Sequence, residues 1–271
     1  MHLRTLGGLE LTVSAEIRLP RRTKPLLLLA YLALEGPKER HHLAELFWPA
    51  ANRPLDSLRV ALSQLRAAAP GVLSEVAPKS AGAGVAPRGG AGVGTTVSCD
   101  ALDLLRALEA ADRARARELY AGEFLAGLYL RDIGAELEEW VLTTRDHVAS
   151  SVQMAGIAEA EGLAAASAFA EAARITVGAL GLVPETDPEL LPRLHRLLSA
   201  ADHPFAADVA RQAATYGMSL TMTPQEAKAE LTAGSKRPAP HNLPVRVAPF
   251  VGRDTELVTL TNLLAGGSRL V

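Results

Sequence analysis

The sequence predicts a mainly α-helical protein, in which a winged helix-turn-helix of the α+β type precedes an all-α, tetratricopeptide-like helical-repeat domain. Three observations carry this prediction. The first hundred residues read as short strands, three helices and a hairpin, in that order. The segment from Asp100 to about Leu231 reads as consecutive helices with capping residues and short joints. The charge divides along the same line: net charge is +5 over residues 1–90 and −10 over residues 91–230, although the whole chain carries only −2.

The composition excludes several classes of protein. The chain has 271 residues, of which 48% are hydrophobic, which is enough for one large domain or two ordinary ones with a buried core. Cys99 is the only cysteine, so a disulfide framework or a multi-cysteine metal site is excluded. No apolar run reaches the roughly 18 residues of a membrane span, and the N-terminus lacks a secretory signal pattern. We expect a soluble, cytoplasmic protein without metal or cofactor.

The sequence predicts that the chain begins with short strands and then a helix. Apolar and polar residues alternate over residues 1–20 on either side of Gly7–Gly8, which predicts two or three short antiparallel strands. A helix follows, with Thr23 as its candidate cap and Leu26–Leu34 as its body, and it ends at Gly36–Pro37.

Two further helices complete the predicted helix-turn-helix. One covers Arg40–Phe47 and stops at Trp48–Pro49, and the other covers Pro54–Ala69. Spacings of three and four residues place the apolar positions of the last helix on a single stripe, made of Leu55, Leu58, Leu62, Leu65 and Ala69. Val72–Val76 and Thr95–Val97 then read as the two strands of a hairpin, separated by a glycine-rich segment that we expect to be flexible.

From Asp100 onward the pattern is helical. The expected helices cover residues 100–110, capped by Ser98 or Asp100, residues 112–120, capped by Asp112, and residues 135–163, 165–180, 188–201, 204–216 and 224–231. Residues 232–249 are rich in proline and lack periodicity, as is typical of a linker. We therefore expect four parts: a winged helix at 1–99, a helical domain at 100–231, the linker at 232–249 and a short final segment at 250–271.

Several motifs then resemble one family. LRTLGGLEL, RRTKPLLLLAYLAL, HHLAELFWP and SLRVALSQLRAA follow one another over residues 3–69 in the order and spacing of the DNA-binding domain of the SARP family, the Streptomyces antibiotic regulatory protein type activators. VSCDALDLLRALEAAD, LYAGEFLAG and ELEEWVLTTRDHV resemble the bacterial transcriptional activator domain that follows it in that family. The resemblance covers roughly residues 3–215. It implies a transcription activator that binds double-stranded DNA, with the helical domain used for homodimerisation or contact with RNA polymerase.

The helix Pro54–Ala69 is the expected reader of the major groove. Its apolar stripe leaves a polar side that comprises Ser57, Arg59, Val60, Ser63, Gln64 and Arg66. Arginine matches the edge of guanine and glutamine that of adenine, so Arg59 and Gln64 are the candidates for base contacts, and Val60 could touch a thymine methyl. The alternative for Arg59 and Arg66 is an ordinary solvated surface arginine.

The other basic residues are candidates for phosphate contacts. They are Arg53 and Arg66 at the two ends of the reading helix, Arg21, Arg22 and Lys24 before the first helix, Arg40 with His41 and His42 at the start of the second, and Lys79 and Arg88 in the expected wing. The wing is longer and richer in glycine and alanine than that of the family, which leaves its contacts open. The two adjacent histidines have no partner four residues away, so a metal site is not expected there.

Other residues point away from catalysis. Phe47 and Trp48 read as core, and Trp140 with Leu137 and Val141 reads as packing between helices. Glu136, Glu138 and Glu139 are closely spaced acids at a helix start, where a negative charge interacts favourably with the helix dipole, and Cys99 has no assigned base. We expect no enzyme. Aromatic residues make up only 4% of the chain, which argues against stacking on single-stranded bases.

The last segment, PFVGRDTELVTLTNLL, resembles the part of larger family members that leads into a nucleotide-binding domain. The glycine- and lysine-containing phosphate loop that would come next does not occur in the sequence, so we expect no nucleotide hydrolysis. The chain is expected to be either a piece of a longer regulator or a shortened one. The competing function is an interaction or oligomerisation scaffold whose winged helix no longer reads DNA.

Overall fold

The computed structural model describes residues 1–14, 17–18, 23–76, 92–128 and 133–233. The chain divides into two compact units, Met1–Ser235 and Lys236–Val271, and all the described residues belong to the first. No helix within these ranges is both long enough and apolar enough to cross a bilayer.

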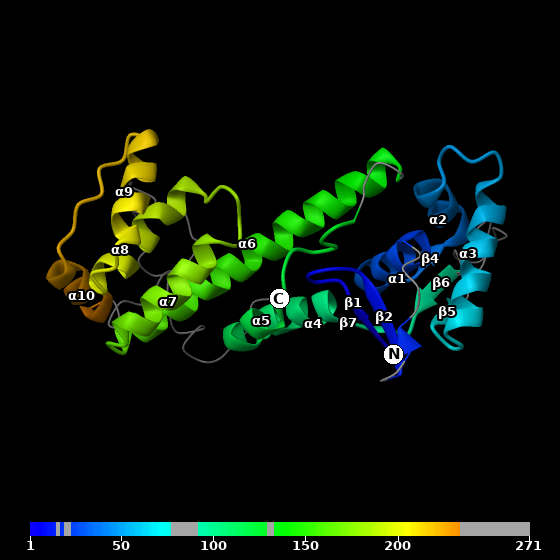
Figure 1. Cartoon of the computed structure of the whole chain (residues 1–271), viewed down its shortest axis with the longest axis horizontal. Helices are drawn as coiled ribbons and strands as arrows, with labels where there is room; N and C mark the ends of the chain where they lie inside the picture. The colour runs from blue at the N-terminus through cyan, green and yellow to red at the C-terminus, as the bar shows by residue number, and fades with distance from the viewer. Residues whose placement is uncertain (15–16, 19–22, 77–91, 129–132, 234–271) are drawn as a thin grey trace, which may run out of the picture. The chain divides into compact units, whose positions relative to one another are not determined.

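The N-terminal part is a winged helix, as the sequence predicts (Figure 1). Its three helices are α1 (Thr23–Glu35), α2 (Arg40–Phe47) and α3 (Pro54–Ala68). A four-stranded sheet has the order β3-β2-β1-β7, made of β1 (His2–Arg4), β2 (Glu10–Ser14), β3 (Ile17–Arg18) and β7 (Ser98–Cys99). A three-stranded sheet has the order β4-β6-β5, made of β4 (Lys38–Glu39), β5 (Leu73–Val76) and β6 (Gly92–Thr95).

The hairpin differs from its prediction in one strand. Its second strand covers Gly92–Thr95 rather than Thr95–Val97, and β4 pairs with its other edge. The reason is close packing. A Cβ atom on Gly94 would lie 2.8 Å from the Ser74 hydroxyl oxygen and 3.2 Å from Cγ of Pro37, so glycine is the residue that lets the strand approach its neighbours here. A glycine that the sequence rules treat as a strand breaker is therefore part of the strand.

The first sheet joins the start of the chain to residues almost one hundred positions later. β1 pairs antiparallel with β2, as expected, but it also pairs parallel with β7, so that Leu3 lies opposite Cys99. Directly after β7, the buried carboxylate of Asp100 accepts hydrogen bonds from the backbone N–H groups of Thr5 at 2.7 Å and Leu6 at 3.0 Å, and from the Thr5 hydroxyl at 2.6 Å. The predicted cap is wrong, because the N-cap position of α4 is Cys99 and Asp100 is the first residue of the helix. The Asp100 carboxylate instead binds the two residues that directly follow β1.

The rest of the described chain is helical, which confirms the predicted all-α part. Its helices are α4 (Asp100–Glu109), α5 (Arg113–Leu119), α6 (Ala135–Ala165), α7 (Phe169–Leu180), α8 (Leu191–Ala200), preceded by the 3-10 turn η2 (Pro188–Leu190), α9 (Phe205–Thr215) and α10 (Pro224–Ala233). α6 is the long helix in Figure 1, and it packs against α5 and α7 as well as against α2 of the winged helix.

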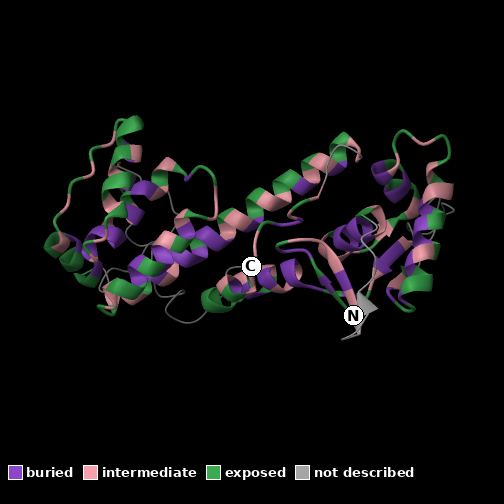
Figure 2. Cartoon of the chain, in the orientation of Figure 1, coloured by how far each residue is buried: buried purple, intermediate pink, exposed green. Residues whose placement is uncertain are grey.

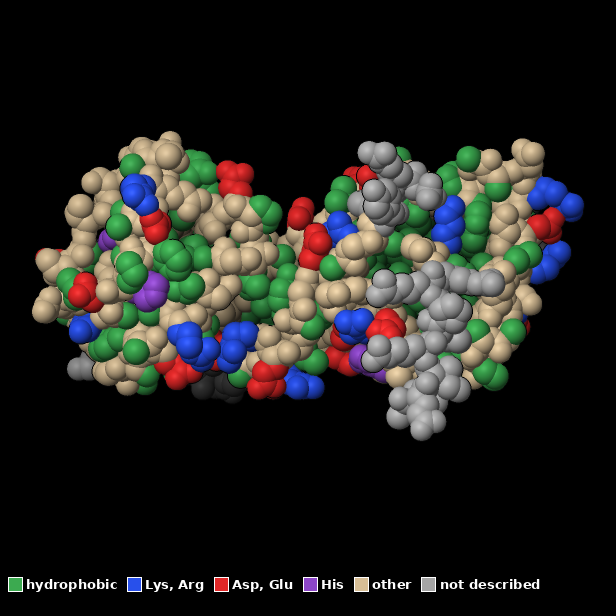
Figure 3. Space-filling model, viewed as in Figure 1, with side chains coloured by type: hydrophobic (Ala, Val, Ile, Leu, Met, Phe, Trp, Pro, Cys, Tyr) green, Lys and Arg blue, Asp and Glu red, His purple; other side chains and the backbone are tan. Residues whose placement is uncertain are grey.

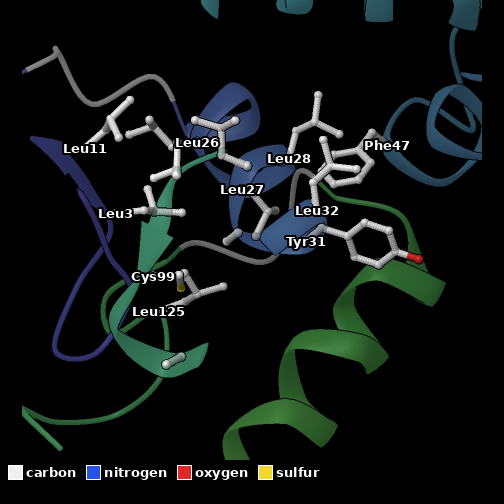
Figure 4. Close-up of a cluster of buried hydrophobic side chains, with 14 of the residues drawn as sticks. Leu3, Leu11, Leu26, Leu27, Leu28, Tyr31, Leu32, Phe47, Cys99 and Leu125 are labelled. Carbon is white, nitrogen blue, oxygen red and sulfur yellow. The ribbon is translucent and has the colours of Figure 1, made fainter. Parts of the chain in front are cut away.

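Two hydrophobic cores stabilise this arrangement. One continues from Leu3 and the three helices of the winged helix through Leu104 and Phe124 to Val152 in α6. Figure 4 shows part of it, where side chains of α1 gather with Leu3, Cys99 and Leu125. The other lies among α6 to α10. The buried residues in Figure 2 follow the inward faces of these helices. Burial of this kind contributes about 25 cal/mol for each Å² of apolar surface removed from water.

Candidate nucleic-acid interface

α3 is held against the winged helix by one apolar side. Leu58, Ala61, Leu62 and Leu65 are buried, and Pro54 in the first turn favours the start of the helix. The predicted stripe is wrong at Leu55, which remains 39% exposed, whereas Ala61 is buried. At about 100° per residue, Leu55 lies at the margin of the buried side and Ala61 lies inside it.

The opposite side of α3 is open to solvent. Arg59, Ser63 and Arg66 are exposed, and the Val60 side chain is 56% exposed. With about 3.6 residues per turn, these residues form one continuous surface along the helix. In the structure, Arg59, Val60, Ser63 and Arg66 of the predicted reading face therefore lie side by side on the exposed side of α3. Whether this face contacts DNA stays a prediction.

Ser57 and Gln64 lie on a different flank of α3. Both are half-buried and line a hollow of about 470 Å³ together with Lys24 at the start of α1 and Trp48 at the end of α2. Gln64 is therefore less accessible than Arg59, whose side chain is 79% exposed. Of the two predicted base contacts, Arg59 projects further from the helix.

The two arginines near the start of α3 share one carboxylate. Nε of Arg53 lies 2.7 Å from Oδ2 of Asp56, and Nη1 of Arg59 lies 3.1 Å from Oδ1 of the same residue. Asp56 is in the first turn of the helix, where a negative charge also interacts favourably with the helix dipole. Both arginines are predicted DNA contacts, whereas the role of Asp56 was missed, although its spacing of three residues from each arginine is a signal in the sequence.

The two other described arginines of the predicted set also share a carboxylate. Oε1 of Glu75 in β5 lies 3.1 Å from Nη2 of Arg40 and 3.0 Å from Nη2 of Arg66. This contact joins the wing strand to the start of α2 and the end of α3. Glu75 is 35 residues from Arg40 in the sequence, so no local pattern could have revealed it. Figure 3 accordingly shows red and blue side chains next to one another over the end of the molecule where α3 lies.

The remaining predicted contacts divide into two groups. Arg21, Arg22, Lys79 and Arg88 lie outside the described residues. His42 is described, and its Nε2 lies 3.0 Å from the Tyr31 hydroxyl. Burial, together with the carboxylates of Glu35 and Glu136, raises the pKa of Tyr31, so this hydroxyl stays protonated and can donate the hydrogen bond. His42 thus has a partner within the protein.

The residues that the sequence assigned to packing do pack. Phe47 is fully buried, and its ring centroid lies 5.8 Å from that of Tyr31. Trp140 in α6 places its ring 5.0 Å from Tyr31 and 5.8 Å from Phe124, and its Nε1 donates a hydrogen bond of 3.0 Å to Glu35. These contacts join α1 to α6.

The described residues contain no group suited to hold a metal, because no three His, Cys, Asp or Glu side chains gather among them. Cys99 is buried, and burial raises the pKa of its thiol, which disfavours the nucleophilic thiolate.

One solved structure with a similar fold is that of Mycobacterium tuberculosis EmbR in complex with a low affinity phosphopeptide. The TM-score is 0.55 at 18% sequence identity, and the match covers 98% of this chain and 70% of that chain. This likeness supports the fold of a winged helix followed by a helical part. Comparisons with protein-family models and with curated proteins find no match.

Proposed function

We propose that this chain is a sequence-specific transcription regulator of the SARP type that binds duplex DNA and activates transcription, with α3 as the reading helix. The observation that carries the proposal is the division of α3 into a buried apolar side and an exposed side with Arg59, Val60 and Ser63 at its centre. A single helix with such an exposed side fits the major groove of B-DNA, which is about 12 Å wide.

The exposed side chains have the chemistry for base recognition. The Arg59 guanidinium can donate two hydrogen bonds to O6 and N7 of a guanine, and the Val60 methyl groups can contact a thymine methyl. Ser57 and Ser63 offer hydroxyls on either flank. Gln64 can pair with an adenine only if the duplex also approaches the side of α3 where the hollow with Lys24 lies.

The other basic side chains would fix the position of the duplex. Arg53, Arg66 and Arg40 lie at the ends of α3 and α2, and Lys24 lies near the start of α1, where the backbone N–H groups also favour phosphate. We include Arg22, Lys79 and Arg88 in this set on their place in the sequence alone, before the first helix and in the expected wing. The acidic helical part repels DNA, which suits a surface for homodimerisation or for contact with RNA polymerase.

The test is selection of duplexes from a random library by the full 271-residue chain, followed by a mobility-shift assay on the selected sequence. We expect one sequence motif to be enriched and to bind at least about 10³-fold more tightly than random duplex at moderate salt. If no motif is enriched and no duplex is retained, the protein is not a sequence-specific DNA-binding regulator.

A second candidate is a scaffold for interaction or oligomerisation. It is favoured by one observation, which is that Arg40, Arg53, Arg59 and Arg66 already have carboxylate partners. In that case the full chain would show a defined oligomeric state by light scattering and no retention on duplex DNA or heparin at moderate salt.

A further inference from the structure

Two carboxylates hold all four arginines that the structure describes in the predicted DNA-contacting set. Asp56 pairs with Arg53 and Arg59, and Glu75 pairs with Arg40 and Arg66, at distances between 2.7 and 3.1 Å. Each cluster contains two positive charges and one negative charge. The two clusters together therefore present a net charge of +2 to an approaching duplex, whereas the four arginines alone would present +4.

The ion pair with Asp56 restricts the direction in which the Arg59 side chain points, and Arg59 is the main candidate for a base contact. Asp56 uses a different oxygen for each arginine, so both contacts form at the same time. The Asp56 side chain is 36% exposed, whereas those of Arg53 and Arg59 are 82% and 79% exposed. The carboxylate therefore lies closer to the helix, and most of each guanidinium remains accessible to DNA.

The Glu75 cluster couples the wing to the helices. Its Oε1 accepts hydrogen bonds from Arg40 and Arg66, which come from α2 and α3, while Glu75 itself belongs to β5. The Glu75 side chain is 63% exposed, so a phosphate group that approaches these arginines also meets a negative charge. On this surface, Glu75 therefore repels a phosphate that Arg40 and Arg66 attract.

Exposed ion pairs of this kind contribute little to folding stability, so stability gives no reason for four arginines to be paired on one surface. Their effect on DNA binding is larger. Non-specific binding depends on the number of phosphates that are neutralised, and each one changes the slope of log K against log salt by about 0.9. A carboxylate beside two arginines weakens this sequence-independent attraction and leaves hydrogen bonds to bases as the stronger source of affinity.

We propose that Asp56 is a specificity-determining residue, which holds Arg53 and Arg59 in a fixed array and weakens binding to duplexes that lack the matching sequence, and that Glu75 weakens phosphate contacts on every duplex. The proposal rests on the proposed function, since it concerns the same surface. Asp56 acts on the base contact of Arg59, and Glu75 acts on the phosphate contacts of Arg40 and Arg66.

The test compares Asp56→Asn and Glu75→Gln with the wild-type full chain. For each protein, the dissociation constant is measured on the selected duplex and on a random duplex of equal length, between about 50 and 200 mM salt. We expect Asp56→Asn to bind the random duplex about three- to tenfold more tightly and the selected duplex with less than about threefold change, so that the ratio of the two constants falls. Glu75→Gln should tighten both duplexes alike, by about three- to tenfold, and keep the ratio, because a phosphate contact does not depend on the sequence. Circular dichroism checks that the variants remain folded.

Glu45→Gln is the matched control, because it changes the net charge by the same amount. Glu45 is exposed on α2 and forms no ion pair with the described residues. If this control tightens binding to the random duplex as much as Asp56→Asn does, the effect is one of overall charge and the proposal is wrong. It is also wrong if Asp56→Asn keeps the wild-type ratio within about twofold, or if Glu75→Gln tightens neither duplex. If the wild-type chain binds neither duplex, the proposed function itself is wrong. The wild-type measurement in the same experiment therefore distinguishes this failure from a failure of the inference about Asp56 and Glu75.

Discussion

Asp100 is the residue that joins the two ends of the winged helix. Its carboxylate is 8% exposed and accepts hydrogen bonds from Thr5, Leu6 and its own neighbour Ala101. Two backbone N–H groups that directly follow β1 therefore depend on one side chain. A buried donor without a partner costs about 1–3 kcal/mol.

We expect Asp100→Ala to lower the free energy of unfolding by about 3 kcal/mol, because the N–H groups of Thr5 and Leu6 lose their acceptor. Urea denaturation followed by circular dichroism measures this change. Asp103→Ala is the control on the same helix, since the Asp103 side chain is 41% exposed and, among the described residues, pairs only with Arg106, at 3.7 Å. It should change stability by less than about 0.5 kcal/mol. Equal effects of the two substitutions would contradict the anchoring role of Asp100.

His195 makes the stability of the helical part dependent on pH. Its side chain is buried in α8, and burial lowers its pKa below the ordinary value of 6.5. The unfolded chain therefore binds a proton at a higher pH than the folded chain does. Stability is fully present above pH 6.5 and falls as the pH drops below it.

We expect the wild-type chain to lose stability between about pH 7.5 and pH 5.5, and His195→Gln to lose less over the same range, because glutamine does not titrate. The measurement is the free energy of unfolding in urea at both values. His147→Gln, which removes an exposed histidine of α6, should keep the wild-type dependence. An unchanged dependence in His195→Gln would show that His195 is not its source.

At the scale of the elements, α6 is the helix that joins the winged helix to the helical part. Its Trp140 contacts the rings of Tyr31 and Phe124 and donates a hydrogen bond to Glu35 in α1. Further along α6, the Arg145 guanidinium donates hydrogen bonds of 2.8 Å to the carbonyl oxygens of Phe124 and Leu125. α6 therefore holds Phe124 and Leu125 through one ring contact and two hydrogen bonds.

We expect Trp140→Ala to lower the free energy of unfolding by about 3 kcal/mol, because it removes a large ring from a packed aromatic group. Trp140→Phe keeps a ring and loses the hydrogen bond to Glu35, so it should cost about 1 kcal/mol. Urea denaturation gives both values. If the alanine variant is as stable as the phenylalanine variant, the ring contacts do not contribute.

Most elements could be predicted from the sequence, because their ends carry local signals. The bounds of α2 agree with the prediction, and Asp112 caps α5 through the N–H of Arg115, as expected. The two-residue strands β4 and β7 were missed, since so short a segment has no periodicity. Their pairing depends on partners far away in the chain.

The candidate site could be predicted only in part. The exposed side of α3 follows from its helical spacing, so Arg59 and Ser63 were found. Glu75 was not, because it reaches Arg40 and Arg66 only once β5 has folded onto the helices. Helix and strand rules describe which face a residue occupies, and they do not describe which charged residue meets it across the fold.

At the scale of the whole molecule, the net charge and the hydrophobic cores divide the chain at different positions. The net charge changes sign near residue 90, which led to a predicted boundary between residues 99 and 100. The larger hydrophobic core includes residues on both sides of that position, from Leu3 to Val152. The boundary stays a prediction. We propose that the basic part binds DNA and that the acidic part repels it, so that only one end of the chain faces the duplex.

The central claim is that α3 reads bases, and the most direct test is the ratio of dissociation constants for random and selected duplexes. We expect Arg59→Ala combined with Gln64→Ala to lower this ratio at least about tenfold, because each base contact contributes about 1–3 kcal/mol of discrimination. Arg53→Ala should weaken both duplexes alike and lower the salt slope by about 1. A double variant that keeps the affinity and the sequence preference of the wild type would contradict the claim.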